Sequence, residues 1–224
     1  MRKSLPVRFG SVAVRPPLVQ PGQRIGLMGG SFNPPHLAHR AIALVALKRL
    51  GLDQVWWLVT PGNPLKGRGD LAPLEERMAL SRAMAQDRRI VPTAFEADLP
   101  SRFTVATLAH LKLRHPGVRF VWTMGADCLA EFHRWQQWRE IFQTMPIAVV
   151  DRPGWRLKAL ASPAAQAFAR CRIPEQEARR LVLQGPPAWT MLSGPLLAVS
   201  STEIRSSRKR GGAGGGGAAS PQKA

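Results

Sequence analysis

The sequence is poor in several residue types that mark common protein classes. It has no tyrosine, two cysteines, and 14 acidic side chains against 32 basic ones in 224 residues. Cys128 and Cys171 lie far apart and outside any metal-ligand spacing, which argues against a disulfide framework and a zinc site. No apolar run approaches the roughly 18 residues of a membrane-spanning helix. Arg8 and Arg15 interrupt what would be the apolar region of a signal peptide. We therefore expect a reduced, cytoplasmic protein with no membrane partner.

The basic excess is concentrated at the two ends of the chain. Residues 1–24 and 205–224 each contain five basic and no acidic side chains, so together they carry +10 of the formal net charge of +18. The interior excess of +8 suits a small polyanionic substrate as well as it suits a nucleic acid. Charge alone therefore leaves an enzyme and a nucleic-acid-binding protein as alternatives.

Composition divides the chain into three parts. Residues 1–23 are basic and proline-rich without periodicity, and residues 211–217 contain six glycines and one alanine. Such segments bury too little apolar surface to fold. We predict a flexible extension over 1–23, one folded domain over 24–205, and a disordered basic, glycine-rich tail over 206–224.

Within the domain, apolar stretches alternate with helical patterns. Strands are expected at residues 24–28, 54–59, near 90, 118–124, 147–150 and 189–192, and helices at 37–50, 73–86, 104–114, after 124 and through 180. This alternation predicts an α/β fold, a Rossmann-like doubly wound parallel sheet with helices on both faces. In such sheets ligands bind beyond the carboxyl ends of the strands, where the first strand-to-helix loop lies.

That first loop reads GGSFNPPHLAHR over residues 29–40. Gly29 and Gly30 let the backbone approach a bulky anion, and the helix that begins near His36 offers unpaired N–H groups to it. His36 and His39 are three residues apart and therefore share one helix face. A solvated helix face and half of a metal site are the alternatives, but the sequence offers no convincing third metal ligand. The loop is neither a P-loop nor a dinucleotide fingerprint.

A second stretch, VSSTEIR over residues 199–205, also looks suited to phosphate. Ser200 and Glu203 alone would make an ordinary capping box at a helix start. A capping box needs neither a third hydroxyl nor Arg205 one turn inside the helix. The hydroxyls and the guanidinium together favour a second phosphate-binding helix N-terminus.

GGSFNPPHLAH and SSTEIR together resemble the nucleotidylyltransferase superfamily, and the residues between them resemble bacterial nicotinate-nucleotide adenylyltransferases. The supporting stretches are TPGNPLK (60–66), LPSRFT (99–104), GAD (125–127), FHRWQQW (132–138) and RPG (152–154). The resemblance covers residues 24–205 and implies the nucleotidylyltransferase type of the fold. The chain departs from the family at Ala38, where glycine is usual, at Phe103, where tyrosine is usual, and after Arg205, where the family continues into a helical segment.

The resemblance implies a reaction, the attack of nicotinate mononucleotide on ATP to give deamido-NAD and pyrophosphate, with Mg²⁺ held mainly by ATP and no protein metal site. It implies catalytic roles for His36, His39 and Arg205. ATP contacts are expected from Gly29, Gly30, Ser31, Phe32, His36, His39, Ser201, Thr202 and Arg205. Nicotinate mononucleotide contacts are expected from Asn63, Lys66, Thr104, Gly125, Asp127, Trp135 and Arg152.

Several alternatives stay open on the sequence. Trp135 is equally well explained by packing against its helix neighbour Trp138, and Lys66 by a solvated position on a loop, while Trp56 and Trp57 are expected in the core. Another adenylyltransferase of the superfamily, acting on nicotinamide mononucleotide or pantetheine phosphate, is the alternative enzyme. A basic nucleic-acid-binding protein on the same fold is the alternative of a different class, although no nucleic-acid motif is present. A homo-oligomer is compatible with the sequence.

Overall fold

A six-stranded parallel sheet forms the centre of the protein. The computed structural model describes residues 8–9, 12–13, 15–62, 71–101, 103–195, 201 and 204–205. The sheet contains β3 (Arg24–Gly30), β4 (Gln54–Val59), β5 (Ile90–Thr93), β6 (Arg119–Gly125), β7 (Ile147–Val150) and β8 (Trp189–Leu192). Its strand order is β5-β4-β3-β6-β7-β8, with every pair parallel. The order reverses direction between β3 and β6, which confirms the predicted doubly wound fold and places a ligand crevice beside the end of β3.

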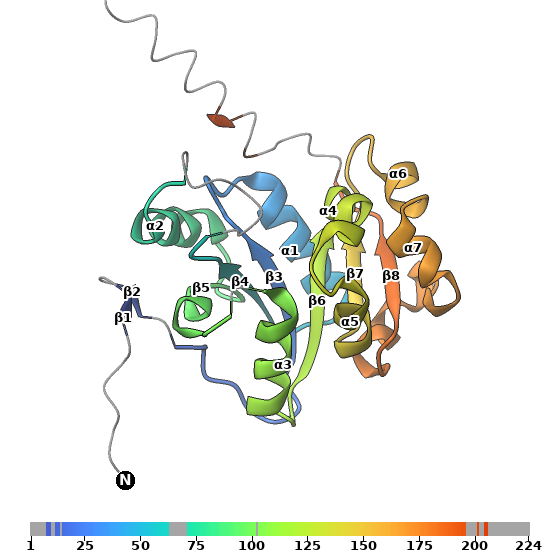
Figure 1. Ribbon diagram of the computed structural model, residues 1–224, viewed down its shortest axis with the longest axis horizontal. Coiled ribbons are helices and arrows are strands. Elements are labelled where there is room, and N and C mark those ends of the chain that lie inside the picture. The colour runs from blue at the N-terminus through green and yellow to red at the C-terminus, as the bar shows by residue number, and fades with distance from the viewer. Residues whose placement is uncertain are drawn as a thin grey trace, which may run out of the picture.

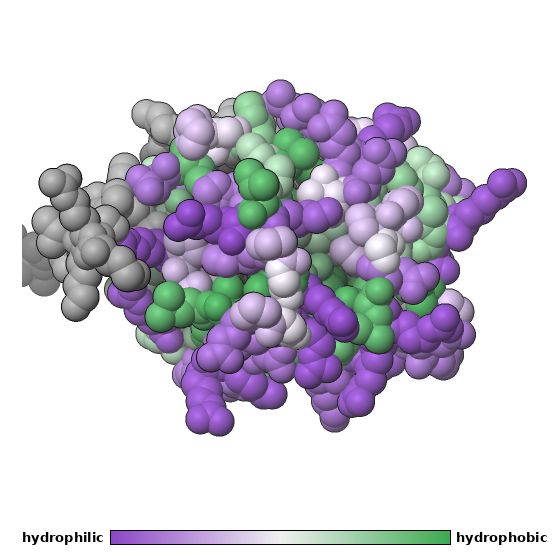
Figure 2. Space-filling model, turned by 90° about the horizontal axis from the view of Figure 1, so that it is seen from below, coloured by the Kyte–Doolittle hydropathy of each residue, from purple (hydrophilic) through white to green (hydrophobic). Residues whose placement is uncertain are grey.

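Helices cover both faces of this sheet (Figure 1). They are α1 (Leu37–Leu50), α2 (Leu74–Ala85), α3 (Thr104–Arg114), α4 (Ala126–Glu131), α5 (Trp138–Thr144), α6 (Arg156–Leu160) and α7 (Pro163–Ala167). The connections also contain 3-10 segments, η2 (Phe95–Asp98), η3 (Phe132–Arg134), η4 (Ala169–Cys171) and the longer η5 (Glu175–Leu183). The carboxyl ends of the strands, with the start of α4, lie at the top of Figure 1. Figure 2 looks at the opposite side, where hydrophilic side chains predominate and apolar ones appear between them.

Two apolar cores lie on the two faces of the sheet. Successive strand residues point to opposite faces, so Trp57 enters the core under α1 and α2, whereas Trp56 enters the core under α3 to α5. Both indoles are completely buried, which confirms their predicted place in the core. The parallel strands are therefore buried on both faces, as their continuous apolar sequences predict.

Several element boundaries differ from the sequence prediction for local reasons. The first helix ends as expected at Gly51, whose φ of 66° is left-handed. Pro73 precedes α2 as its N-cap rather than forming its first turn. The helix expected after residue 124 is not continuous, because Gln137 has a φ of 54° and separates η3 from α5. The region through residue 180 consists of short helical turns rather than one long helix.

Part of the N-terminal extension has regular backbone. β1 (Arg8–Phe9) pairs with β2 (Val12–Ala13) as a two-residue antiparallel ladder. The N–H of Gly22 donates to the carbonyl of Gly117, which ties the extension to the loop before β6. The predicted tail at 206–224 lies outside the described residues, and the boundaries proposed at 23 and 205 stay a prediction.

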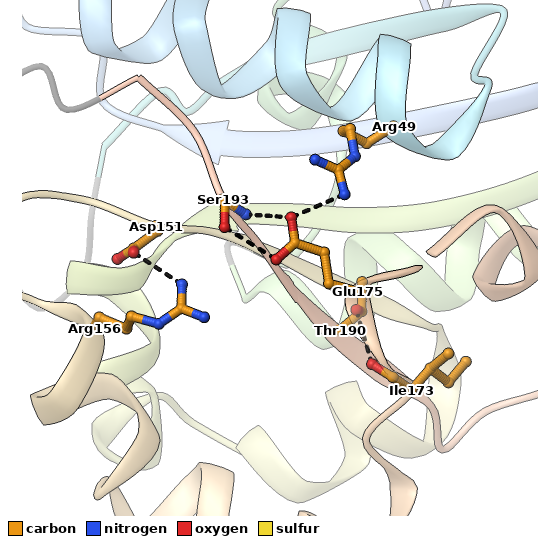
Figure 3. A network of polar contacts seen from close by, with 7 residues as sticks. All are labelled: Arg49, Asp151, Arg156, Ile173, Glu175, Thr190 and Ser193. Carbon is orange, nitrogen blue, oxygen red and sulfur yellow. Dashed lines mark hydrogen bonds and ion pairs between the residues drawn. The ribbon is translucent and has the colours of Figure 1, made fainter. Parts of the chain in front are cut away.

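A carboxylate network holds the last strand against α1 (Figure 3). Glu175 accepts hydrogen bonds from the N–H and the hydroxyl of Ser193, at 2.9 and 3.0 Å, and pairs with Arg49 at 2.9 Å. Its neighbours lower the pKa of Glu175 against the opposing effect of burial. Ser193 directly follows β8, so the network fixes the point from which the chain leaves for the second motif. In the described part of the chain, no helix is long and apolar enough to cross a membrane.

Candidate active site

The loop after β3 leads directly into the N-terminus of α1. His36 is the N-cap residue of α1, and the first turn of this helix contains no acidic side chain. No carboxylate of that turn therefore offsets the partial positive charge of the helix start. This position favours an anionic ligand.

The two histidine rings of the loop stack on each other. Their centroids are 3.7 Å apart and the ring planes differ by 26°. The backbone N–H of His36 donates to Nδ1 of His39 over 3.2 Å. An Nδ1 that accepts a hydrogen bond carries no proton, so neutral His39 has its proton on Nε2. The geometry therefore makes His39 a hydrogen-bond donor through Nε2.

The surroundings of His39 keep its ring neutral. Burial, followed by the charges of His36 and Arg152, places the pKa of His39 well below its ordinary value. Phe32 packs on one side, with ring centroids 4.7 Å apart, and Trp57 meets the ring edge-on. At neutral pH this side chain offers a hydrogen bond rather than a positive charge.

The C-terminal motif lies against the same loop. The hydroxyl of Ser201 donates to the carbonyl of Pro34 over 2.9 Å, and Nη1 of Arg205 donates to the carbonyl of Asn33 over 2.5 Å. Two stretches more than 160 residues apart in the sequence therefore meet at the start of α1. Thr202, the remaining predicted phosphate contact of this motif, lies outside the described residues.

The predicted acceptor residues occupy two places. Thr104 is the first residue of α3, whose N-cap, Phe103, provides no side-chain cap. Trp135 is half-buried and packs on Phe132 and Trp122, at centroid distances of 4.9 and 6.3 Å. Trp135 packs against the core on the α3 face, so packing explains part of its position.

Asp127 and Arg152 stand instead beside α1. They form a close ion pair, and a Cβ on Gly125 would collide with the Asp127 carboxylate and approach Ile42 of α1 to 3.3 Å. Arg152 is also close enough to lower the pKa of His39. Asn63 and Lys66 lie outside the described residues.

One buried charged residue near the loop, Arg77, was not predicted from the sequence. It is 1% exposed and donates to the carbonyls of Ser31, Thr60 and Ala72. A signal for it existed, because Arg77 falls between the buried Leu74 and the buried Ser81 on the inner face of α2. An arginine on the face of a helix that points toward the core therefore indicated a buried guanidinium.

Comparisons with known proteins agree with this arrangement. A family model described as cytidylyltransferase-like matches residues 27–207. The probable nicotinate-nucleotide adenylyltransferase of Agrobacterium fabrum is 54% identical over 185 residues, covering 83% of this chain and 99% of that protein. That of Methylorubrum extorquens strain PA1 is 56% identical over 183 residues, covering 82% and 99%. The chain belongs to the nicotinate-nucleotide adenylyltransferase family.

A solved structure shares the fold of this adenylyltransferase family member. Plasmodium falciparum nicotinic acid mononucleotide adenylyltransferase complexed with NaAD superimposes with a TM-score of 0.62 at 18% identity, covering 82% of this chain and 83% of that one. At this identity the likeness concerns the fold alone. It agrees with the Rossmann-like sheet described above.

Gly29 of this adenylyltransferase has no space for a side chain. A Cβ there would lie 2.6 Å from Cη2 of Trp122, a side chain that is 1% exposed. We expect Gly29→Ala to lower the free energy of unfolding by about 1 to 3 kcal/mol, because the indole must shift within a packed core. Urea denaturation measures this. Gly185→Ala is the matched control, since its Cβ would meet nothing within 4 Å, and equal stabilities for the two variants would contradict the prediction.

Glu96 makes stability depend on pH. Burial raises its pKa to about 7, although the Thr107 hydroxyl donates to it over 2.9 Å and opposes the shift. The folded state therefore binds this proton more tightly than the unfolded state. Stability should fall as pH rises from about 4.5 to about 7 and then level off.

Glu96→Gln imitates the neutral acid and keeps an acceptor for Thr107. We expect the variant to match the original chain near pH 4.5 and to be more stable by about 1 to 3 kcal/mol at pH 8. Urea denaturation at both pH values measures the difference. Stability curves that stay parallel from pH 4.5 to 8 would show that folding does not raise the pKa of Glu96.

Proposed function

We propose that His36, His39, Arg205 and the loop after β3 carry out the reaction of the family in this chain. The chain transfers AMP from ATP to nicotinate mononucleotide, giving deamido-NAD and pyrophosphate in NAD biosynthesis. The observation that carries the assignment of the site is the meeting of the two motifs, in which Ser201 and Arg205 contact the loop that ends at His36.

The proposed step is in-line attack of the mononucleotide phosphate on the α-phosphorus of ATP. The new P–O bond forms as the bond to the pyrophosphate oxygen breaks, and pyrophosphate leaves as an anion. The attacking phosphate is already an anion at neutral pH, so the step needs no general base. Catalysis then consists of positioning the two anions and stabilising the charge of the transferring group.

The triphosphate would lie across the two helix starts. His39 donates from Nε2 to an oxygen of the transferring phosphate. His36, at the N-terminus of α1, also contacts the triphosphate. The backbone of residues 29–32, which begins the same loop, would contact the phosphates of ATP. These residues are Gly29, Gly30, Ser31 and Phe32. Arg205 donates from Nη1 to the carbonyl of Asn33, and its guanidinium is assigned to the β- and γ-phosphates together with Ser201 and Thr202.

The acceptor would bind between the end of β6 and the start of α3. Trp135 would stack its indole face on the nicotinate ring, and the hydroxyl of Thr104 would donate to the nicotinate carboxylate. Gly125, Asp127 and Arg152 take the position where the two nucleotides meet, because this ion pair stands beside α1 and near His39. Asn63 and Lys66 are assigned to the acceptor phosphate on the family resemblance.

Mg²⁺ is expected to enter with ATP. Among the residues that the structure describes, no group of three or more His, Cys, Asp and Glu side chains is arranged to hold a metal ion. The donors that line the loop suit phosphate oxygens, which are themselves the preferred ligands of this hard ion. When bound to the triphosphate, Mg²⁺ neutralises part of its charge. A cytoplasmic location and a homo-oligomer also stay predictions.

Pyrophosphate release tests the assignment. The full chain is supplied with ATP, Mg²⁺ and either nicotinate mononucleotide or phosphopantetheine, and a pyrophosphate-coupled assay follows the rate. We expect release with the first acceptor only. Turnover with phosphopantetheine alone would favour the alternative adenylyltransferase, and no turnover with salt-sensitive binding to nucleic acid would favour the alternative of a different class.

A further inference from the structure

Arg77 lies in the middle of the inner face of α2, where a charged side chain is costly. It is 1% exposed, and no carboxylate among the described residues forms an ion pair with it. Burial lowers the pKa of Arg77 from its usual value. A positive charge removed from water in this way needs well-placed acceptors.

Its acceptors are three backbone carbonyls from three different segments. Nε donates to Ala72 over 2.9 Å, and Nη1 donates to Ser31 over 2.7 Å and to Thr60 over 2.8 Å. Ser31 belongs to the loop after β3, Thr60 follows β4, and Ala72 leads into α2. One rigid guanidinium therefore fixes three segments at the carboxyl edge of the sheet.

Neighbouring contacts strengthen the same junction. The N–H of Thr60 donates to the carbonyl of Gly30 over 3.1 Å, and the N–H of Ala72 donates to the side chain of Asn33 over 3.3 Å. The loop after β3 is thus connected twice to the segments that Arg77 holds. A displacement of the guanidinium would be transmitted to the loop.

The contact with Ser31 also sets the direction of a donor. A trans peptide unit points its C=O and N–H in opposite directions, so a Ser31 carbonyl held by Arg77 turns the N–H of Phe32 away from Arg77. Phe32 has a φ of 46°, a left-handed conformation that a bulky residue adopts when its surroundings impose it. Its N–H makes no hydrogen bond to the part of the chain that the structure describes, which leaves this donor for a ligand.

We propose that Arg77 is a positioning residue for adenylyl transfer, because it locks the Ser31–Phe32 peptide in the orientation that presents the Phe32 N–H to the triphosphate. The proposal rests on the proposed function of the loop. Arg77 itself contacts no substrate in the proposed mechanism. Its buried positive charge also lies directly behind the loop and raises the affinity of the site for a polyanion.

The test uses three variants of the full chain. Arg77→Met keeps an unbranched side chain without N–H groups, and Arg77→Lys keeps the charge without the planar fork that serves three carbonyls. Arg82→Met is the matched control, since Arg82 is an exposed residue of the same helix. For each variant, thermal unfolding, the Kd of a nonhydrolysable ATP analogue, and kcat with nicotinate mononucleotide are measured at a temperature where the variant is folded.

We expect Arg77→Met to raise the Kd of the analogue about tenfold and to lower kcat about tenfold, because the loop loses its preset donor. Arg77→Lys should be intermediate, and Arg82→Met should stay within about twofold on both constants. A lower melting temperature with both constants unchanged would show a structural role alone and overturn the proposal. If Arg77→Met does not fold, unchanged constants in Arg77→Lys overturn it.

The analogue separates this proposal from the choice of acceptor. Binding of the analogue needs the loop but no nicotinate mononucleotide. If the original chain bound the analogue and released no pyrophosphate with this acceptor, the proposed reaction would be wrong. The effect of Arg77 on the Kd would still be measurable, so the two failures can be told apart.

Discussion

Replacing His39 with alanine is expected to lower kcat by at least about 10²-fold while the protein stays folded, because the variant loses a fixed donor aimed at the transferring phosphate. The donor is fixed because Nδ1 of His39 accepts the N–H of His36, so the proton stands on Nε2. Stacking on His36 holds the ring in place. A preset donor stabilises charge that develops in the transition state without reorganisation at the moment of reaction.

The measurement is kcat for the original chain, His39→Ala and a control. His110→Ala is suitable because His110 is an exposed histidine on α3, and it should leave kcat unchanged. Thermal unfolding of each protein shows whether it is folded. A kcat of His39→Ala close to that of the original chain would remove His39 from the proposed mechanism.

The protonation state of His39 adds a second readout. Burial places the pKa of His39 well below its ordinary value of 6.5. The ring should therefore stay neutral between pH 8 and pH 6.5. The ratio of kcat between the original chain and His39→Ala should therefore be constant over that interval. A ratio that changes steeply near pH 6.5 would mean that the charged imidazolium takes part in the reaction.

The sequence predicted the sheet and the loop well, because both depend on local patterns. Alternating apolar and helical stretches identify the strands, and Gly51 marks the end of α1 through its left-handed φ. The meeting of Ser201 and Arg205 with the loop followed from the family resemblance rather than from spacing, since no local rule brings together residues this far apart.

Residues whose position depends on tertiary contacts were harder to predict. The helix position of Arg77 indicates burial, but its three carbonyl partners lie on separate segments that no local pattern brings together. Gln137 interrupts the helix expected after residue 124 through a left-handed backbone conformation that its residue type does not specify.

Nicotinate mononucleotide should be preferred over nicotinamide mononucleotide by about 30- to 1,000-fold in kcat/KM. The proposed nicotinate position lies at the start of α3, where Phe103 supplies no side-chain cap and the first turn has no acidic side chain. Its first N–H groups and the Thr104 hydroxyl are therefore donors for an anion, reinforced by the helix dipole. A carboxylate offers acceptors on both oxygens, whereas a carboxamide turns its own N–H donors toward a donor of the pocket.

A mismatch of this kind in a dry pocket is worth roughly 2 to 4 kcal/mol, which corresponds to the expected range of discrimination.

Glu96 lies near α3 through its contact with Thr107, and burial raises the pKa of Glu96 to about 7, so its charge should not repel the acid below that pH. The preference should accordingly narrow as pH rises above about 7 and persist in Glu96→Gln. The deciding measurement is kcat/KM for both mononucleotides under identical conditions at pH 6.5 and 8.5. Equal values at pH 6.5 would contradict the acid-specific pocket, and a preference for the amide would place the carboxylate-binding donors elsewhere.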